Sequence, residues 1–105
     1  MARRIKHETL VASTVTTVTL TGSDYPRVQV TNVSGAAAIY FCVNGLGGPS
    51  ADGVPTVAGD DCFVAAGAAG AEVTVSSGKV DSDDADTVVK LISSGTPTVA
   101  VEGVS

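Results

Sequence analysis

The hydrophobic pattern of the first half of the chain alternates with a period of two, which is typical of β-strands. Arg27 to Val33 (RVQVTNV) alternates strictly and predicts a half-exposed strand. Ala38 to Val43 (AIYFCV) is apolar on both faces, so we expect it at the centre of a sandwich. Glu8 to Thr21 has an offset alternation, which predicts one long strand with a bulge near Ser13.

The second half contains four further strand patterns. Cys62 to Ala66 and Ala71 to Ser76 are separated by the Gly67 to Gly70 turn, which predicts a hairpin. Thr87 to Ser93 and Thr98 to Val104 form a closing pair of strands. With the first half this makes seven strands, and no segment has the periodicity and caps of a helix.

The pattern as a whole predicts an all-β fold, a single antiparallel β-sandwich of about seven strands. An immunoglobulin-like and a jelly-roll-like strand order produce the same alternation, so both remain open. We expect residues 1–8 to form an extended N-terminal arm and residues 9–105 to form the sandwich domain.

Composition agrees with this fold and limits the possible ligands. Val, Thr, Ala and Gly make up 56 of the 105 residues, and β-branched side chains favour strands. Two Phe, two Tyr and no Trp leave a core of small aliphatic groups, which neighbouring subunits could help to stabilise. So few aromatic rings disfavour a binding surface that stacks on bases or sugars.

Charge is distributed unevenly along the chain. The net charge is −5, yet Arg3, Arg4 and Lys6 lie among the first six residues, so the remainder carries −8. The basic start is not followed by an apolar stretch, and no run of 18 apolar residues occurs. We therefore expect neither a secretory signal nor a membrane segment. The protein should be made and assembled in a cytosol, or leave it by a route unrelated to this sequence.

Candidate catalytic groups are few. His7 is the only histidine and lies in the arm, where no surrounding fold would hold it against a nucleophile. The paired carboxylates, at Asp60 to Asp61 and within Asp81 to Asp86, have no apolar pocket residues beside them that would raise a pKa. We expect no enzyme activity and no cofactor.

The acidic segment Asp81 to Asp86 has oxygen ligands that suit calcium. It departs from the EF-hand pattern, because Asp86 stands where that loop needs glycine and Ile92 where it needs glutamate. A solvated turn is the favoured interpretation, and a cation site shared with another loop stays open.

Cys42 and Cys62 lie in two predicted strands. Free buried thiols are the favoured interpretation, while a disulfide between strands facing each other across the sandwich remains an alternative. Two thiols and one histidine are too few for a zinc site of four ligands.

Two segments are candidates for binding another protein. The arm ARRIKHE suits docking on an acidic protein surface or addition to an exposed sheet edge, and the acidic body disfavours nucleic acid. A disordered terminus without a role is the alternative. The connection from Asn44 to Asp61 contains five Gly and two Pro and is longer than ordinary connections, which indicates a functional, mobile or clamped loop.

The segments RVQVTN, AIYFCVNG, PTVAGDDCFV and VVKLISSGTPTVAVEG, over roughly residues 9–104, resemble small virion proteins of tailed bacteriophages. Those proteins are compact β-sandwiches of capsid surfaces or tails. The resemblance implies a non-enzymatic virion protein made in the host cytoplasm, most simply a decoration (cement) protein that stabilises the outer capsid surface. A tail or head-tail connector protein and a host-binding adhesion module are the alternatives.

The resemblance also implies partners: the major capsid protein or other virion proteins, and further copies of this chain. Under it, the arm meets the shell or a neighbouring subunit, and the long loop touches a sister copy. The residues expected to bind are Arg3, Arg4, Ile5, Lys6 and His7 of the arm, and Leu46, Pro49, Val54, Pro55 and Val57 of the loop.

Overall fold

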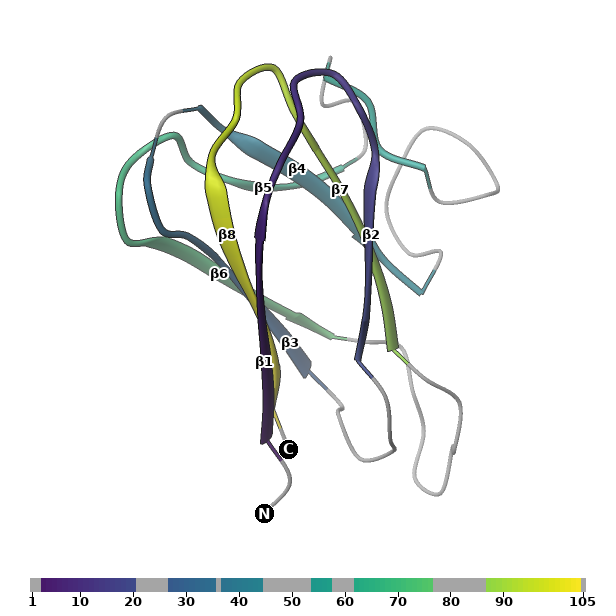
Figure 1. Ribbon diagram of the computed structural model, residues 1–105. Helices are drawn as coiled ribbons and strands as arrows, with labels where there is room; N and C mark the ends of the chain where they lie inside the picture. Colours follow the sequence, from purple (N-terminus) through teal and green to yellow (C-terminus); the bar gives the residue numbers. More distant parts are fainter. Residues whose placement is uncertain are drawn as a thin grey trace.

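The computed structural model describes residues 3–20, 27–35, 37–44, 54–57, 62–76 and 87–104. Within these ranges the chain forms eight β-strands and no helix, arranged as two four-stranded sheets packed face to face (Figure 1). The all-β antiparallel sandwich is therefore confirmed. In chain order the strands are β1 (Arg3–Thr9), β2 (Thr16–Leu20), β3 (Arg27–Asn32), β4 (Ile39–Val43), β5 (Phe63–Ala65), β6 (Ala71–Ser76), β7 (Thr87–Ser93) and β8 (Thr98–Val104).

The strand order is that of a jelly roll. The first sheet has the order β1-β8-β3-β6 and the second the order β2-β7-β4-β5. The pairs β1·β8, β2·β7, β3·β6 and β4·β5 are those of one long antiparallel hairpin, and rolling it up adds the pairs β8·β3 and β7·β4. Of the two arrangements that alternation leaves open, the structure has the eight-stranded double sheet of the jelly roll.

The register is nearly constant along this rolled hairpin. Facing residues are Arg3 and Val104, Thr16 and Leu91, Arg27 and Ser76, and Ile39 and Ala65. In these four pairs the two residue numbers add to 107, 107, 103 and 104. The pairing register therefore shifts by at most four residues along the rolled hairpin. A slip of one residue would turn the core-facing residues of a strand to the solvent.

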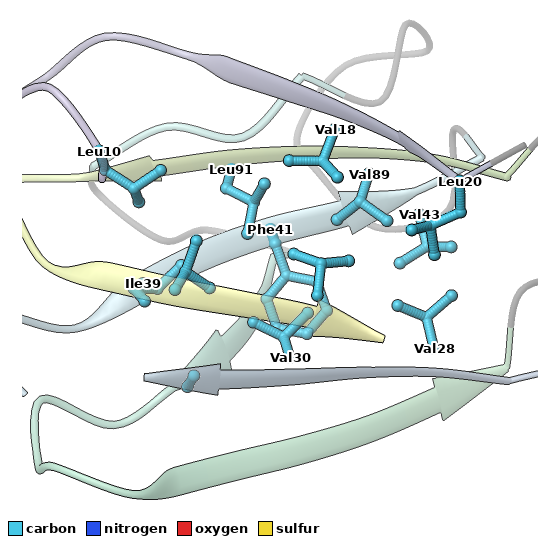
Figure 2. Packing of buried hydrophobic residues seen from close by; sticks show 13 residues of the cluster. Leu10, Val18, Leu20, Val28, Val30, Ile39, Phe41, Val43, Val89 and Leu91 are labelled. Atoms are coloured by element: carbon cyan, nitrogen blue, oxygen red, sulfur yellow. The ribbon is translucent and has the colours of Figure 1, made fainter. Parts of the chain in front are cut away.

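The core follows the alternation expected from the sequence. β3 and β8 bury every second residue, whereas β4, in the middle of the second sheet, is buried at four of its five positions. Phe41 is the largest fully buried side chain and lies among the other core residues (Figure 2). The centre of its ring is 5.6 Å from that of Phe63. The other members of the core are Leu10, Val18, Leu20, Val28, Val30, Ile39, Val43, Ala65, Val89, Leu91, Val99 and Val101.

The connections differ from the expected hairpins. β5 and β6 lie in different sheets, and so do β7 and β8, so each short turn takes the chain across the sandwich. The predicted long strand from Glu8 to Thr21 is likewise two strands, β1 and β2, which belong to different sheets. The expected bulge at Ser13 is a turn with φ of 55°. A connection between strands of different sheets is called an arch below. Two strands joined by an arch alternate in the same way as two strands joined by a hairpin turn, so the sequence pattern could not distinguish them.

One buried side chain, Asn32 at the end of β3, joins two of these arches. Its Nδ2 donates to the carbonyl oxygens of Ala37 (2.7 Å) and Ala66 (3.0 Å), and its Oδ1 accepts from the Gly35 N–H (2.8 Å). Its carbonyl oxygen accepts from the Gly70 N–H (2.8 Å). The β3–β4 and β5–β6 connections are thus bonded to a single residue.

A second buried polar residue, Ser93 at the end of β7, extends this network. Its Oγ donates to the Ala38 carbonyl (2.7 Å) and accepts from the Gly95 N–H (3.3 Å). Its carbonyl oxygen accepts from the Ser13 N–H (2.8 Å) in the β1–β2 connection. All four arches at this end of the sandwich are therefore connected by hydrogen bonds.

Small residues let the arches approach each other. A Cβ on Gly35, whose φ is +71°, would lie 2.2 Å from the backbone nitrogen of Ala69. A Cβ on Gly67 would lie 3.1 Å from the backbone nitrogen of Ala38. The backbones of the β3–β4 and β5–β6 arches are thus nearly in contact, which a larger residue would prevent.

We predict that Asn32→Ala lowers the free energy of unfolding by about 3 kcal/mol, because it leaves two carbonyls and one N–H without their buried partner. Urea denaturation measures this change. Gln29→Ala, on the outer face of the same strand, is the matched control and should cost less than about 1 kcal/mol. Equal losses in the two variants would contradict the role of Asn32.

Gly35→Ala tests the close approach of the arches separately from backbone strain. Gly70 has φ of +84° but nothing within 4 Å of a built Cβ, so Gly70→Ala should cost only about 1 kcal/mol of conformational strain. Gly35→Ala adds a clash with backbone and should cost at least about 3 kcal/mol. Thermal or urea unfolding that ranks the two variants equally would refute this packing.

Candidate functional site

The N-terminal segment forms the outermost strand of the first sheet. β1 pairs with β8 along its whole length, from Arg3 opposite Val104 to Thr9 opposite Thr98, as the adjacent strands of Figure 1 show. The expected arm is thus extended, but it lies within the sheet instead of projecting from it. A strand at this position has one row of backbone N–H and C=O groups directed away from the sheet.

Side chains contribute little to holding β1 in place. Ile5 is 52% exposed, and Lys6, His7, Glu8 and Thr9 are also exposed. The first core residue of the chain follows the strand, since Leu10 is only 1% exposed. Between residues 5 and 9 the strand is therefore held mainly by its backbone ladder with β8.

The two faces of β1 carry different chemistry. Directly opposite residues in a ladder share a face, so Ile5 lies beside Glu102 on the outer face of the first sheet. Lys6 lies opposite the fully buried Val101, on the face that the sandwich encloses, and yet it is exposed. A charged side chain directed inward on an edge strand discourages unplanned pairing with another strand.

The connection after β1 is anchored by its backbone. The Leu10 N–H donates to the carbonyl of Pro97 (2.9 Å), and the Thr14 N–H donates to the carbonyl of Val11 (3.1 Å). Val11 is 60% exposed and Val15 is 37% exposed, so this arch presents apolar side chains to the solvent. Sequence alternation missed this feature, because the offset of the two valines was interpreted as a bulge within one long strand.

The candidate residues of the long loop differ in how far their side chains are exposed. Leu46 and Pro49 lie outside the described residues. Val54 is half-buried and Pro55 is buried, so these two pack against the chain itself. Of the three loop candidates within the described residues, Val57 is the one whose side chain is exposed, at 42%.

The candidate residues therefore separate into two groups. Ile5, Lys6 and His7 are neighbouring exposed positions of β1, at the edge of the first sheet. Val57 belongs to the connection between β4 and β5 of the second sheet. Arg3 and Arg4 are placed by the ladder opposite Val104 and Gly103.

The two cysteines are neighbours in one sheet, not partners across the sandwich. Cys42 of β4 is 1% exposed, and Cys62, just before β5, is half-buried. Neither is part of a disulfide, and their side chains are hydrogen-bonded to each other. Burial raises the pKa of Cys42 to about 11, the Cys62 thiol acts in the same direction, and the charge of Lys90 opposes both.

The described part of the chain offers no further reactive cluster. Among these residues there is no group of three or more His, Cys, Asp and Glu side chains that could hold a metal ion. The acidic segment Asp81 to Asp86 and the pair Asp60 to Asp61 fall outside the described residues. Nor do the described ranges contain a helical segment with the length and hydropathy needed to span a membrane.

Known proteins offer no relative from which a function could be transferred. No family model matches this sequence, and no significant match was found among curated proteins or solved structures. The geometry of the chain is therefore the basis for any proposal about its function.

Proposed function

We propose that this chain is a structural protein of a tailed-bacteriophage virion, a decoration protein that binds the outer surface of the capsid and stabilises it. The observation that supports this most is an eight-stranded jelly roll whose edge strand β1 contains Arg3, Arg4 and Lys6 and is exposed from Ile5 to Thr9. The jelly roll is a double-sheet design found in viral capsid proteins and also in lectins and cupins. The fold alone is therefore an analogy, and the edge strand supplies the argument from this chain.

The edge strand has features suited to docking. Ile5 and Lys6 are both exposed, on opposite faces of β1, so one short strand presents an apolar side chain and an ammonium group. The rest of the chain carries −8, so the basic residues at the start are the natural contact for an acidic surface. Because residues 5–9 bury no side chain in the core, the strand can adjust to a partner without opening the domain.

Many copies on one particle make weak single contacts sufficient. Each subunit bound to a shell lies close to others, and the effective concentration of a second contact is then high. Val57 on the loop is placed in this proposal against a sister copy, while β1 meets the shell. Binding to the assembled shell and not to dissociated subunits would stabilise the shell by mass action.

Co-sedimentation with empty shells assembled from the major capsid protein of the same genome tests the proposal. We expect saturable binding at a fixed ratio of copies per shell and a higher melting temperature of the decorated shell. Binding to isolated tails in place of shells would replace the decoration role with the tail role. Binding to neither would refute a virion function, and glycan binding by the purified chain would favour the adhesion alternative.

Deletion of residues 2–7 should lower shell occupancy by at least about tenfold, because it removes the basic residues and most of the exposed strand. The domain should remain folded, since Leu10 and the arch that follows it are retained. Circular dichroism and urea denaturation check the fold, and sedimentation checks the occupancy. Unchanged occupancy by a folded deletion variant would remove β1 from the binding site.

Charge reversal distinguishes a local contact from general electrostatics. Lys6→Glu should reduce shell affinity several-fold and weaken its dependence on salt. Arg27→Glu changes the charge equally, at an exposed position of β3 that is separated from β1 by β8, and should reduce affinity less than about twofold. Equal losses in both variants would mean that net charge, and not the edge strand, governs binding.

A further inference from the structure

Cys42 and Cys62 occupy facing positions at the end of the β4·β5 ladder. The last pair in this ladder is Phe41 with Phe63. Cys42 follows Phe41 and Cys62 precedes Phe63, so the two cysteines would form the next pair of the antiparallel ladder. Facing residues of antiparallel strands have Cα atoms about 4.5–5.5 Å apart, and a disulfide needs about 4.4–6.8 Å. The hydrogen bond between the two thiols places the sulfur atoms next to each other as well.

The surroundings of the pair give the two thiols different access to solvent. The neighbours of Cys42 on β4 face the core, so Cys42 itself lies on the opposite face of the sheet. It is still only 1% exposed, whereas Cys62 is half-buried. Lys90 of β7 stands directly opposite Cys42 on the other side of β4. Its positive charge favours the thiolate of Cys42, in opposition to the effect of burial.

We propose that Cys42 and Cys62 are the site of a reversible intramolecular disulfide, formed by exchange with a low-molecular-weight disulfide such as glutathione disulfide. The bond joins β4 directly to the residue that precedes β5. It therefore closes a loop of residues 43–61, which includes most of the connection between β4 and β5. This inference rests on the register of two strands and is independent of the virion proposal.

The exchange takes place in two steps. The Cys62 thiolate, which is the more accessible, attacks the glutathione disulfide, forms a mixed disulfide and releases one glutathione thiolate. Cys42 then loses its proton and attacks the sulfur of Cys62, which releases the second glutathione. The pair gives up two electrons and two protons, and the glutathione disulfide takes them up as two molecules of thiol.

The bond should stabilise the fold without rearranging it. A cross-link restricts the unfolded chain more strongly when the closed loop is long, and here it spans 19 intervening residues. Because facing positions already have a suitable spacing, the native strands need not move. We expect the melting temperature of the oxidised chain to be roughly 10 °C above that of the reduced chain, and to return to the lower value on reduction.

The test incubates the folded full chain with glutathione disulfide and follows it by intact-mass spectrometry after alkylation. The wild-type chain should lose two hydrogens, take up no alkylating agent, and recover both thiols and its original melting temperature with dithiothreitol. A wild-type chain that keeps two alkylatable thiols, or that stops at the mixed disulfide, would overturn the proposal. This readout requires no variant and therefore no assumption about folding of a mutant.

Two single variants test the order of the steps. Cys42→Ser should accumulate one glutathione on Cys62, because the resolving thiol is missing. Cys62→Ser should acquire glutathione at least about tenfold more slowly, because the remaining thiol is buried. Equal rates of modification in the two variants would contradict the assignment of Cys62 as the attacking thiol.

Discussion

The near contact of the β3–β4 and β5–β6 arches is the constraint on which the rest of the fold depends. Asn32 satisfies three backbone groups with one buried side chain, and the arches approach so closely that Gly35 has no space for a Cβ. A buried amide with all its partners is strongly position-specific, because each lost bond leaves a desolvated polar group. This end of the sandwich therefore fixes the separation and the alignment of the two sheets.

The same constraint explains the composition. The arches are rich in alanine and glycine, and larger residues at Gly35 or Gly67 would push the two backbones apart. Valine and threonine then provide strands whose core sides fill the narrow space between the sheets with small aliphatic groups. Phe41 and Phe63 supply the only large rings packed in the described core. In this protein the arrangement of the two sheets therefore depends on close packing of backbones in the arches as well as on packing of side chains in the core.

In this arrangement strands β2 to β8 form a closed domain, and β1 is a strand added to its edge. The three inner pairs of the rolled hairpin are joined by core side chains and by the Asn32 and Ser93 networks. β1 is joined to β8 by main-chain bonds, and its side chains from Ile5 to Thr9 stay outside the core. Exposed Ile5, Lys6 and His7 thus lie on a strand whose side chains contribute little to the core. For that reason we place the proposed docking function in β1.

Sequence alone could predict the sandwich because core burial follows alternation, as in β3 and β8. It could not predict the jelly roll, since a short turn such as Gly67 to Gly70 fits a hairpin and an arch equally well. The hydrogen bonds of Asn32 were missed because its acceptors are the backbone carbonyls of Ala37 and Ala66, which leave no signal in the sequence. The Cys42 and Cys62 pair depends on a register set across 19 intervening residues, which no local pattern specifies.

Native-state hydrogen exchange of the β8 amides tests most directly whether β1 is an added strand on a closed domain. In a strand paired on both sides, alternate amides bond to the two neighbours, here β1 and β3. We expect protection to alternate along β8, with the amides bonded to β1 opening at a much lower free energy than those bonded to β3. Uniform protection at the free energy of global unfolding, in β8 and in β1, would contradict this account.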